Sequence, residues 1–156
     1  MASRLDFVPS NLVYLFCQHE EIEVNDNELK RLLFVCVENS NRSQMAQAFA
    51  RIHGGDGVEA YSAGSRPSGK VNPKAIEAMR ELGYDLAAHT SKAVTDLPVL
   101  SFDAVVTMGC GDACPAVPAK LREDWQIPDP REMQPQEFRK VRDLISEKVR
   151  DLIRRV

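Results

Sequence analysis

Short apolar runs alternate with segments of helical periodicity from residue 31 onward, and this alternation limits the folds that the chain can adopt. The apolar runs are RLLFVC at 31–36, VEAYSAG at 58–64 and FDAVVTM at 102–108, with WQIPDP at 125–130 as a candidate short fourth. The helical segments are 42–55, 72–83 and 135–156. Because strands that alternate with helices form parallel sheets covered on both faces, we expect an α/β fold with a four-stranded parallel sheet and helices on both faces. Ligands should bind at the carboxyl ends of the strands.

The predicted helices have typical boundaries and apolar faces. Asn72 suits an N-cap, Pro73 suits the first helical position, and Gly83 follows the end of the same segment. The first helix should bury Met45, Ala46, Phe49 and Ala50. The last helix has an apolar stripe made of Phe138, Val141, Ile145, Val149, Leu152 and Val156.

Composition narrows the class of protein. With 156 residues, 44% of them hydrophobic, the chain can bury one substantial core. A net charge of −3 without a long basic block predicts no nucleic-acid or membrane partner. The apolar run at 12–17 is too short for a membrane span or a signal peptide, so we expect a cytoplasmic protein with reduced cysteines.

The first 30 residues differ from the remainder. They contain a short apolar patch and then EEIEVNDNE, which has acidic residues and no basic ones. We therefore divide the chain into an N-terminal extension of unknown role at 1–30 and a catalytic domain at 31–156.

A cysteine ends the first predicted strand, and an arginine opens the following helix. Five residues, Val37, Glu38, Asn39, Ser40 and Asn41, separate Cys36 from Arg42. Such a loop can turn backbone N–H groups inward as an anion nest beside the helix N-terminus, and arginine adds a planar fork of donors. We expect this site to bind an oxyanion and to favour a thiolate at Cys36, with Ser43 as a hydrogen-bond donor to the sulfur. The alternative is a buried structural cysteine.

Two further cysteines follow the third predicted strand, in MGCGDACP. Cys110 and Cys114 should therefore lie at the same sheet edge as Cys36, on a loop that Gly109 and Gly111 allow to bend. This is where a thiol relay needs its second thiol. A zinc site is the weaker interpretation, because the chain has no second cysteine pair with metal spacing. A pair of unreactive loop thiols is the other alternative.

The segment IPDP places Asp129 between two prolines. A stiff loop of this kind can hold a carboxyl group over the anion site as a general acid. The alternative is an ordinary turn aspartate.

These motifs, in this order, resemble a known family. NSNRSQMA, YSAG, NPKAIEAMRELGYDLAAHTSK, FDAVVTMGCGDACP and REDWQIPDP are similar to the thioredoxin-coupled arsenate reductase branch of the low-molecular-weight protein tyrosine phosphatase superfamily. The resemblance covers roughly residues 31–156. It implies the flavodoxin-like strand order of that superfamily and reduction of arsenate to arsenite.

The resemblance also implies a reaction sequence. Cys36 attacks the arsenic, Arg42 and the loop amides hold the oxygens, and Asp129 protonates the leaving group. Cys110 then attacks Cys36, and Cys114 attacks Cys110; the residues alone would also allow Cys114 to attack first. No bound cofactor or metal is implied, and thioredoxin or a similar thiol reductant completes the cycle.

The chain departs from that family at several positions. Glu38 stands where the family usually has a glycine, Asn41 replaces a cysteine, and Gln47 replaces a carboxylate that helps bind potassium in some members. The second and third cysteines are also closer together than in the best-known members. These differences predict a like charge near the substrate and argue against a potassium site.

Two other functions remain open at this point. A phosphomonoester or tyrosine phosphatase would need Cys36, Arg42 and Asp129 but not the cysteine pair. A non-catalytic oxyanion-binding or redox-sensing module would bind without turnover.

Overall fold

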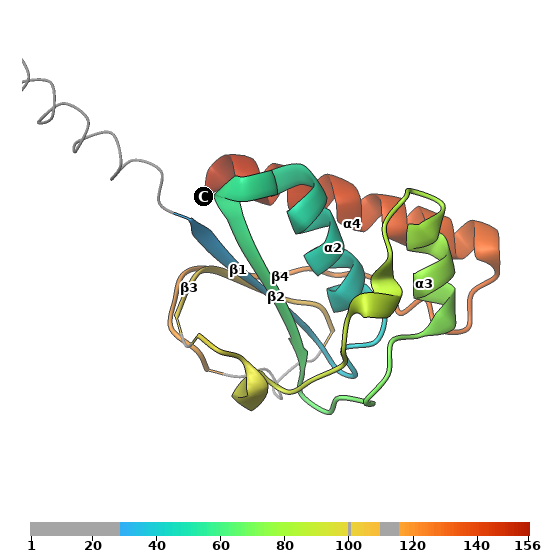
Figure 1. Cartoon of the computed structure of the whole chain (residues 1–156), viewed down its shortest axis with the longest axis horizontal. Helices are drawn as coiled ribbons and strands as arrows, with labels where there is room; N and C mark the ends of the chain where they lie inside the picture. Colours follow the sequence, from blue (N-terminus) through green and yellow to red (C-terminus); the bar gives the residue numbers. More distant parts are fainter. Residues whose placement is uncertain (1–28, 100, 110–115) are drawn as a thin grey trace, which may run out of the picture.

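The computed structural model describes residues 29–99, 101–109 and 116–156. Four parallel strands form one sheet: β1 (Lys30–Cys36), β2 (Val58–Gly64), β3 (Phe102–Thr107) and β4 (Ala119–Asp124). Their order is β2-β1-β3-β4 (Figure 1). The predicted four-stranded parallel sheet and the flavodoxin-like order are both confirmed.

Three α-helices accompany the sheet: α2 (Arg42–Gly54), α3 (Pro73–Arg80) and α4 (Pro135–Arg155). The 3₁₀ helices are η2 (Gly55–Gly57), η3 (Leu86–Ala88) and η4 (Val94–Asp96). The predicted start of α3 is confirmed, since the Asn72 side chain accepts a hydrogen bond from the Lys74 N–H and Pro73 is the first helical residue. None of the helices in the described ranges is both long enough and apolar enough to span a bilayer.

The two faces of the sheet are covered unequally. Leu32 and Phe34 of β1 belong to a core cluster that includes buried residues of α2, α3 and α4. Leu33 and Val35 point to the opposite face, where they pack with Leu97, just after η4. Helical turns therefore cover both faces, but all three described α-helices lie on one of them and the 3₁₀ helix η4 lies on the other (Figure 1).

Helix α2 is more buried than its sequence pattern indicates. Every residue from 42 to 50 is buried, including polar ones, whereas the pattern predicts one apolar face. The reason is that α2 packs between the sheet and α4, so two of its sides lose contact with water. The stripe predicted for α4 is buried from Phe138 to Leu152.

The fourth strand is not where the sequence pattern placed it. WQIPDP forms no strand; the fourth strand is the preceding AKLRED, which pairs with β3 from Ala119↔Phe102 to Thr107↔Asp124. As an edge strand it is only half-buried on alternate residues, so its charged side chains are tolerated. The two prolines of WQIPDP have no N–H for a strand ladder.

Candidate active site

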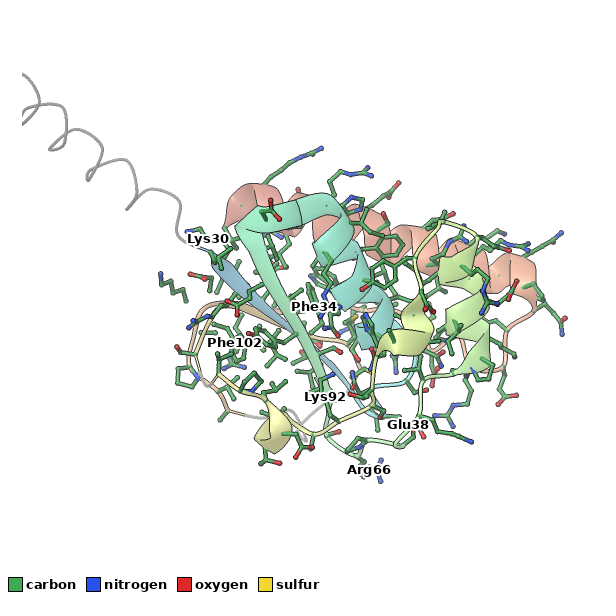
Figure 2. All side chains as sticks on the ribbon, viewed as in Figure 1. Lys30, Phe34, Glu38, Arg66, Lys92 and Phe102 are labelled. Atoms are coloured by element: carbon green, nitrogen blue, oxygen red, sulfur yellow. The ribbon has the colours of Figure 1, made fainter. Side chains whose placement is uncertain are left out.

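The candidate site lies where β1, β3 and β4 end. Cys36 is the last residue of β1 and Arg42 is the first residue of α2, so the loop 37–41 joins an inner strand of the sheet to the helix that follows it. Figure 2 shows Lys30 and Glu38, which flank the two ends of β1, at opposite ends of the sheet, with Glu38 on the side of Lys92 and Arg66. A pocket of about 300 Å³ opens there. It is lined by Cys36, Val37, Glu38, Ser40, Asn41, Arg42, Gly109, Asp129 and Arg131. The fold thus brings Cys36, Arg42 and Asp129 together, as predicted.

The backbone of the loop has the orientation that an anion nest needs. The carbonyls of Cys36, Val37 and Glu38 accept hydrogen bonds from the N–H groups of residues 65, 66 and 68, outside the loop. The Ser40 carbonyl accepts one from Asn72. In a trans peptide the N–H points opposite to the carbonyl, so the loop amides that follow these carbonyls face the pocket.

Asn39 holds the loop in this shape. It is fully buried and has φ of 50°, the left-handed region that asparagine tolerates better than most residues. Its Oδ1 accepts hydrogen bonds from the Lys92 N–H (3.0 Å) and from Gln44 Nε2 (2.9 Å), while its Nδ2 donates to Ser43 Oγ (2.8 Å). Its sequence position marked Asn39 as a loop member but did not indicate this central role.

Ser43 lies directly against the candidate nucleophile. Its Oγ is 2.9 Å from Cys36 Sγ, and both residues are buried. Because Ser43 Oγ already accepts a hydrogen bond from Asn39, its own hydrogen is available to the sulfur. The structure therefore places Ser43 within hydrogen-bond distance of Cys36 Sγ, and its role as a donor to a thiolate stays a prediction.

A chain of hydrogen bonds extends from this pair to His89. Gln44 Nε2 donates to Asn39, and Gln44 Oε1 is 2.9 Å from His89 Nδ1. His89 Nε2 contacts Arg51 Nη1 and the Tyr84 hydroxyl. Since arginine can only donate, Nε2 is the acceptor and Nδ1 carries the hydrogen.

The charge state of His89 fits this arrangement. Burial, and then the positive charges of Arg51 and Lys92, lower the pKa of His89 to about 4, so the ring is neutral near pH 7. Sequence reasoning treated His89 only as one of three scattered histidines and missed Gln44 altogether. Neither carries a motif of its own, and only the fold brings residues 44 and 89 together.

Arg42 connects the anion loop to the segment that carries Asp129. Its Nη1 donates to the Ile127 carbonyl (3.0 Å), and its Nη2 is 4.0 Å from Asp129 Oδ2. Gly109 allows this approach, because a Cβ at that position would lie 2.7 Å from Arg42 Nη1. Its φ of 76° also favours glycine.

Asp129 makes a local turn contact and also lines the Cys36 pocket. Its Oδ1 accepts a hydrogen bond from the Arg131 N–H (3.1 Å), which is the local turn contact expected of such an aspartate. Its Oδ2 is the atom nearest to Arg42, and the residue lines the Cys36 pocket. The turn therefore orients the carboxyl group toward the site.

Glu38 is paired rather than isolated. Its carboxylate forms an ion pair with Arg131 at the mouth of the pocket. Arg131 also lies 3.9 Å from Asp129. The like charge that the sequence predicts near the substrate is thus offset by a second arginine that the sequence reasoning did not single out.

The side-chain amide of Gln47 is hydrogen-bonded within the protein. Its Oε1 accepts a hydrogen bond from Ser62 (2.6 Å), and its Nε2 donates to the Ala60 carbonyl (3.2 Å). Both polar atoms of the Gln47 amide therefore have hydrogen-bond partners within the protein. The expectation that this chain has no potassium site stays a prediction.

The remaining predicted cysteines, Cys110 and Cys114, lie outside the described residues. Gly109, which immediately precedes Cys110 in the chain, lines the Cys36 pocket.

Proteins similar to this chain in sequence and fold include arsenate reductases. Arsenate reductase 1 of Staphylococcus epidermidis is 40% identical over 131 residues, which cover 81% of this chain and 98% of that protein. A solved arsenate reductase in the phosphate-binding state superposes with a TM-score of 0.74 at 35% identity, covering 82% of this chain and 99% of that one. A thioredoxin-dependent arsenate reductase of Corynebacterium glutamicum gives a TM-score of 0.69 at 35% identity, covering 81% of this chain and 61% of that one. Residues 31–156 match the family described as low molecular weight phosphotyrosine protein phosphatase. The chain belongs to this family.

Proposed function

We propose that this protein is an arsenate reductase that converts arsenate to arsenite by thiol chemistry at Cys36. The observation that carries the proposal is the pocket in which Cys36, 2.9 Å from Ser43 Oγ, faces the same space as Arg42 and Asp129. The arsenate reductases among its relatives support this choice of reaction.

The first step is attack of the Cys36 thiolate on arsenate. An As–S bond forms and an As–O bond breaks, and the Asp129 carboxyl group supplies the proton with which the oxygen leaves as water. Arg42 and the inward-facing loop amides hold the remaining oxygens. Ser43 donates to the sulfur in the thiolate state.

The second step transfers the electrons. The Cys110 thiolate attacks Cys36 Sγ, so an S–S bond forms while the S–As bond breaks with its electron pair left on arsenic. Arsenic is thereby reduced from As(V) to As(III) and leaves as arsenite. Cys114 then attacks Cys110, which frees Cys36 and leaves a Cys110–Cys114 disulfide.

This order of attack follows the resemblance to arsenate reductases. The position of Gly109 at the pocket supports Cys110 as the first attacking thiol, because the two residues are adjacent in the chain.

An external dithiol protein closes the cycle by reducing that disulfide. The thioredoxin-dependent relative from Corynebacterium glutamicum supports thioredoxin as the reductant. Such reductants keep thiols reduced in the cytoplasm, where we place the reaction. We assign catalysis to residues 31–156, the range of the family match, and assign no role to residues 1–30.

The test is arsenate-dependent NADPH consumption with thioredoxin and thioredoxin reductase. Multiple turnover should occur in the wild type and collapse in Cys110→Ser and in Cys114→Ser, while Cys17→Ser, the matched cysteine outside the relay, keeps it. Hydrolysis of p-nitrophenyl phosphate by a wild type that shows no arsenate-dependent turnover would instead identify a phosphatase. Phosphate binding without either activity would identify a binding module.

A further inference from the structure

The ion pair between Glu38 and Arg131 separates two neighbouring pockets. The first is the Cys36 pocket of about 300 Å³. The second, of about 280 Å³, is lined by Ser68, Lys70, Val71, Asn72 and Pro73. Glu38, Ser40 and Arg131 line both, so the two charged side chains stand between the spaces.

Each member of the pair comes from a segment that is held independently. The Glu38 carbonyl accepts hydrogen bonds from the Ser68 N–H and from Ser91 Oγ. The Arg131 carbonyl accepts one from Lys74 Nζ (2.8 Å). Because hydrogen bonds hold both backbones, the ion pair connects the anion loop to the loop that carries Asp129 at a defined position beside the pocket.

The charge and the position of the Glu38–Arg131 pair both bear on which oxyanions can enter the Cys36 pocket. The pair is neutral as a unit, so it adds no net repulsion against a doubly charged oxyanion. It lies between the Cys36 pocket and the second pocket, so a substituent on that oxyanion could reach the second pocket only past this pair. An aryl or alkyl phosphate has such a substituent, whereas arsenate and inorganic phosphate do not.

We propose that the Glu38–Arg131 pair is a specificity-determining partition that restricts the Cys36 pocket to small inorganic oxyanions and excludes phosphate monoesters. This inference deepens the proposed function, because it concerns the substrate class of the same site. It also gives Glu38, which replaces the usual glycine, a physical role.

The test compares the binding of inorganic phosphate and phenylphosphonate by calorimetry, so it needs no turnover. The wild type should bind phosphate at least about tenfold more tightly than phenylphosphonate, since the ion pair stands between the Cys36 pocket and the neighbouring pocket that could take the phenyl group. In the Glu38→Ala/Arg131→Ala double variant the two pockets merge. That variant should gain about tenfold in affinity for phenylphosphonate relative to its affinity for phosphate.

The single variants separate charge from size. Glu38→Ala leaves Arg131 unpaired and should tighten phosphate binding about fivefold, while Arg131→Ala leaves Glu38 unpaired and should weaken it by a similar factor. The matched control is Arg31→Ala/Glu59→Ala, which removes an ion pair of similar exposure (44% and 37%, against 50% and 35%) at the other end of the sheet. It should leave both affinities unchanged.

Equal affinity of the wild type for the two ligands, or no gain for phenylphosphonate in a double variant that keeps its circular dichroism spectrum, overturns the partition. If the wild type shows no arsenate turnover, the proposed function is refuted but the partition is not, since the two affinities are measured without turnover.

Discussion

The hydrogen bond from Ser43 to Cys36 can be tested by giving the Ser43 hydroxyl a different acceptor for its hydrogen. In the structure Asn39 Nδ2 donates to Ser43 Oγ, which leaves the serine hydrogen for the sulfur. In Asn39→Asp, a nearly isosteric change, a carboxylate oxygen replaces that donor. The Ser43 hydrogen then turns to the carboxylate, and the Cys36 thiolate loses its donor.

The size of the effect follows from the hydrogen bond that is lost. A hydrogen bond to a charged group contributes about 1.5–3 kcal/mol, which corresponds to a loss of about 10- to 150-fold in kcat/KM for arsenate. Ser43→Ala removes the same hydrogen bond directly and should lose a similar factor. Asn39→Asp also adds a buried negative charge near the thiolate, so its loss should be the larger of the two. The double variant should still lose less than the product of the two single losses, because the two changes share one hydrogen bond.

The assay is kcat/KM for arsenate reduction, together with the rate at which iodoacetamide alkylates Cys36, followed by mass spectrometry of its peptide. Both rates should fall together in Asn39→Asp and Ser43→Ala. Gln136→Glu is the control: it makes the same amide-to-carboxylate change on the exposed first turn of α4 and should alter neither rate. A double variant whose loss is the product of the two single losses would refute the shared hydrogen bond.

Three further outcomes are expected. Gly109→Ala should lower kcat/KM for arsenate at least about tenfold, because its Cβ would lie 2.7 Å from Arg42 Nη1. Gly69→Ala is the control, because Gly69 also has a positive φ but has open space around it. Chemical denaturation should show that Gly69→Ala lowers the free energy of unfolding by about 1 kcal/mol, and kinetics should show that its activity is unchanged. Because the pKa of His89 is about 4 in the folded protein and 6.5 in the reference state, its contribution to stability is complete above pH 6.5 and is lost as the pH falls toward 4. Allowing for partial solvent screening, urea unfolding should show a loss of about 2 kcal/mol over this range that is absent in His89→Gln; an equal loss in both proteins would assign it to other groups. Replacing sodium by potassium at constant ionic strength should leave kcat/KM and the unfolding midpoint unchanged, since the neutral Gln47 stands where a carboxylate helps bind potassium in similar proteins; stabilisation by potassium would contradict this expectation.

Local sequence signals located much of the fold. The observed bounds agree closely with the sequence patterns for the strands at 30–36 and 58–64 and for the start of α3 at Pro73. The reason is that apolar periodicity and helix capping depend on residues that are close together in the sequence. The prediction of the fourth strand at WQIPDP is wrong because the local pattern does not mark the true strand. AKLRED has few apolar residues, and its pairing with β3 depends on a strand that is distant in the sequence.

In the candidate site, too, the sequence predicted the features that are local in the chain. The spacing of Cys36 and Arg42 was sufficient to predict an anion loop at a strand end, since both residues lie within one continuous strand-loop-helix unit. The expectation of a general acid at Asp129 required the resemblance to a family, because a turn aspartate and a general acid look alike in one short segment, and that role remains a prediction. The Cys110 and Cys114 relay remains a prediction.

The sequence by itself determined the anion loop, the helix caps and the alternation that makes a parallel sheet. These depend on backbone geometry and on side chains within a few residues of one another. Only the tertiary structure decided that Asn39, Gln44 and His89 form one hydrogen-bonded chain and that Glu38 meets Arg131. Those contacts join segments that are 45 and 93 residues apart, and hydrogen bonds and ion pairs between such segments exist only where packing of the whole core brings the chain together.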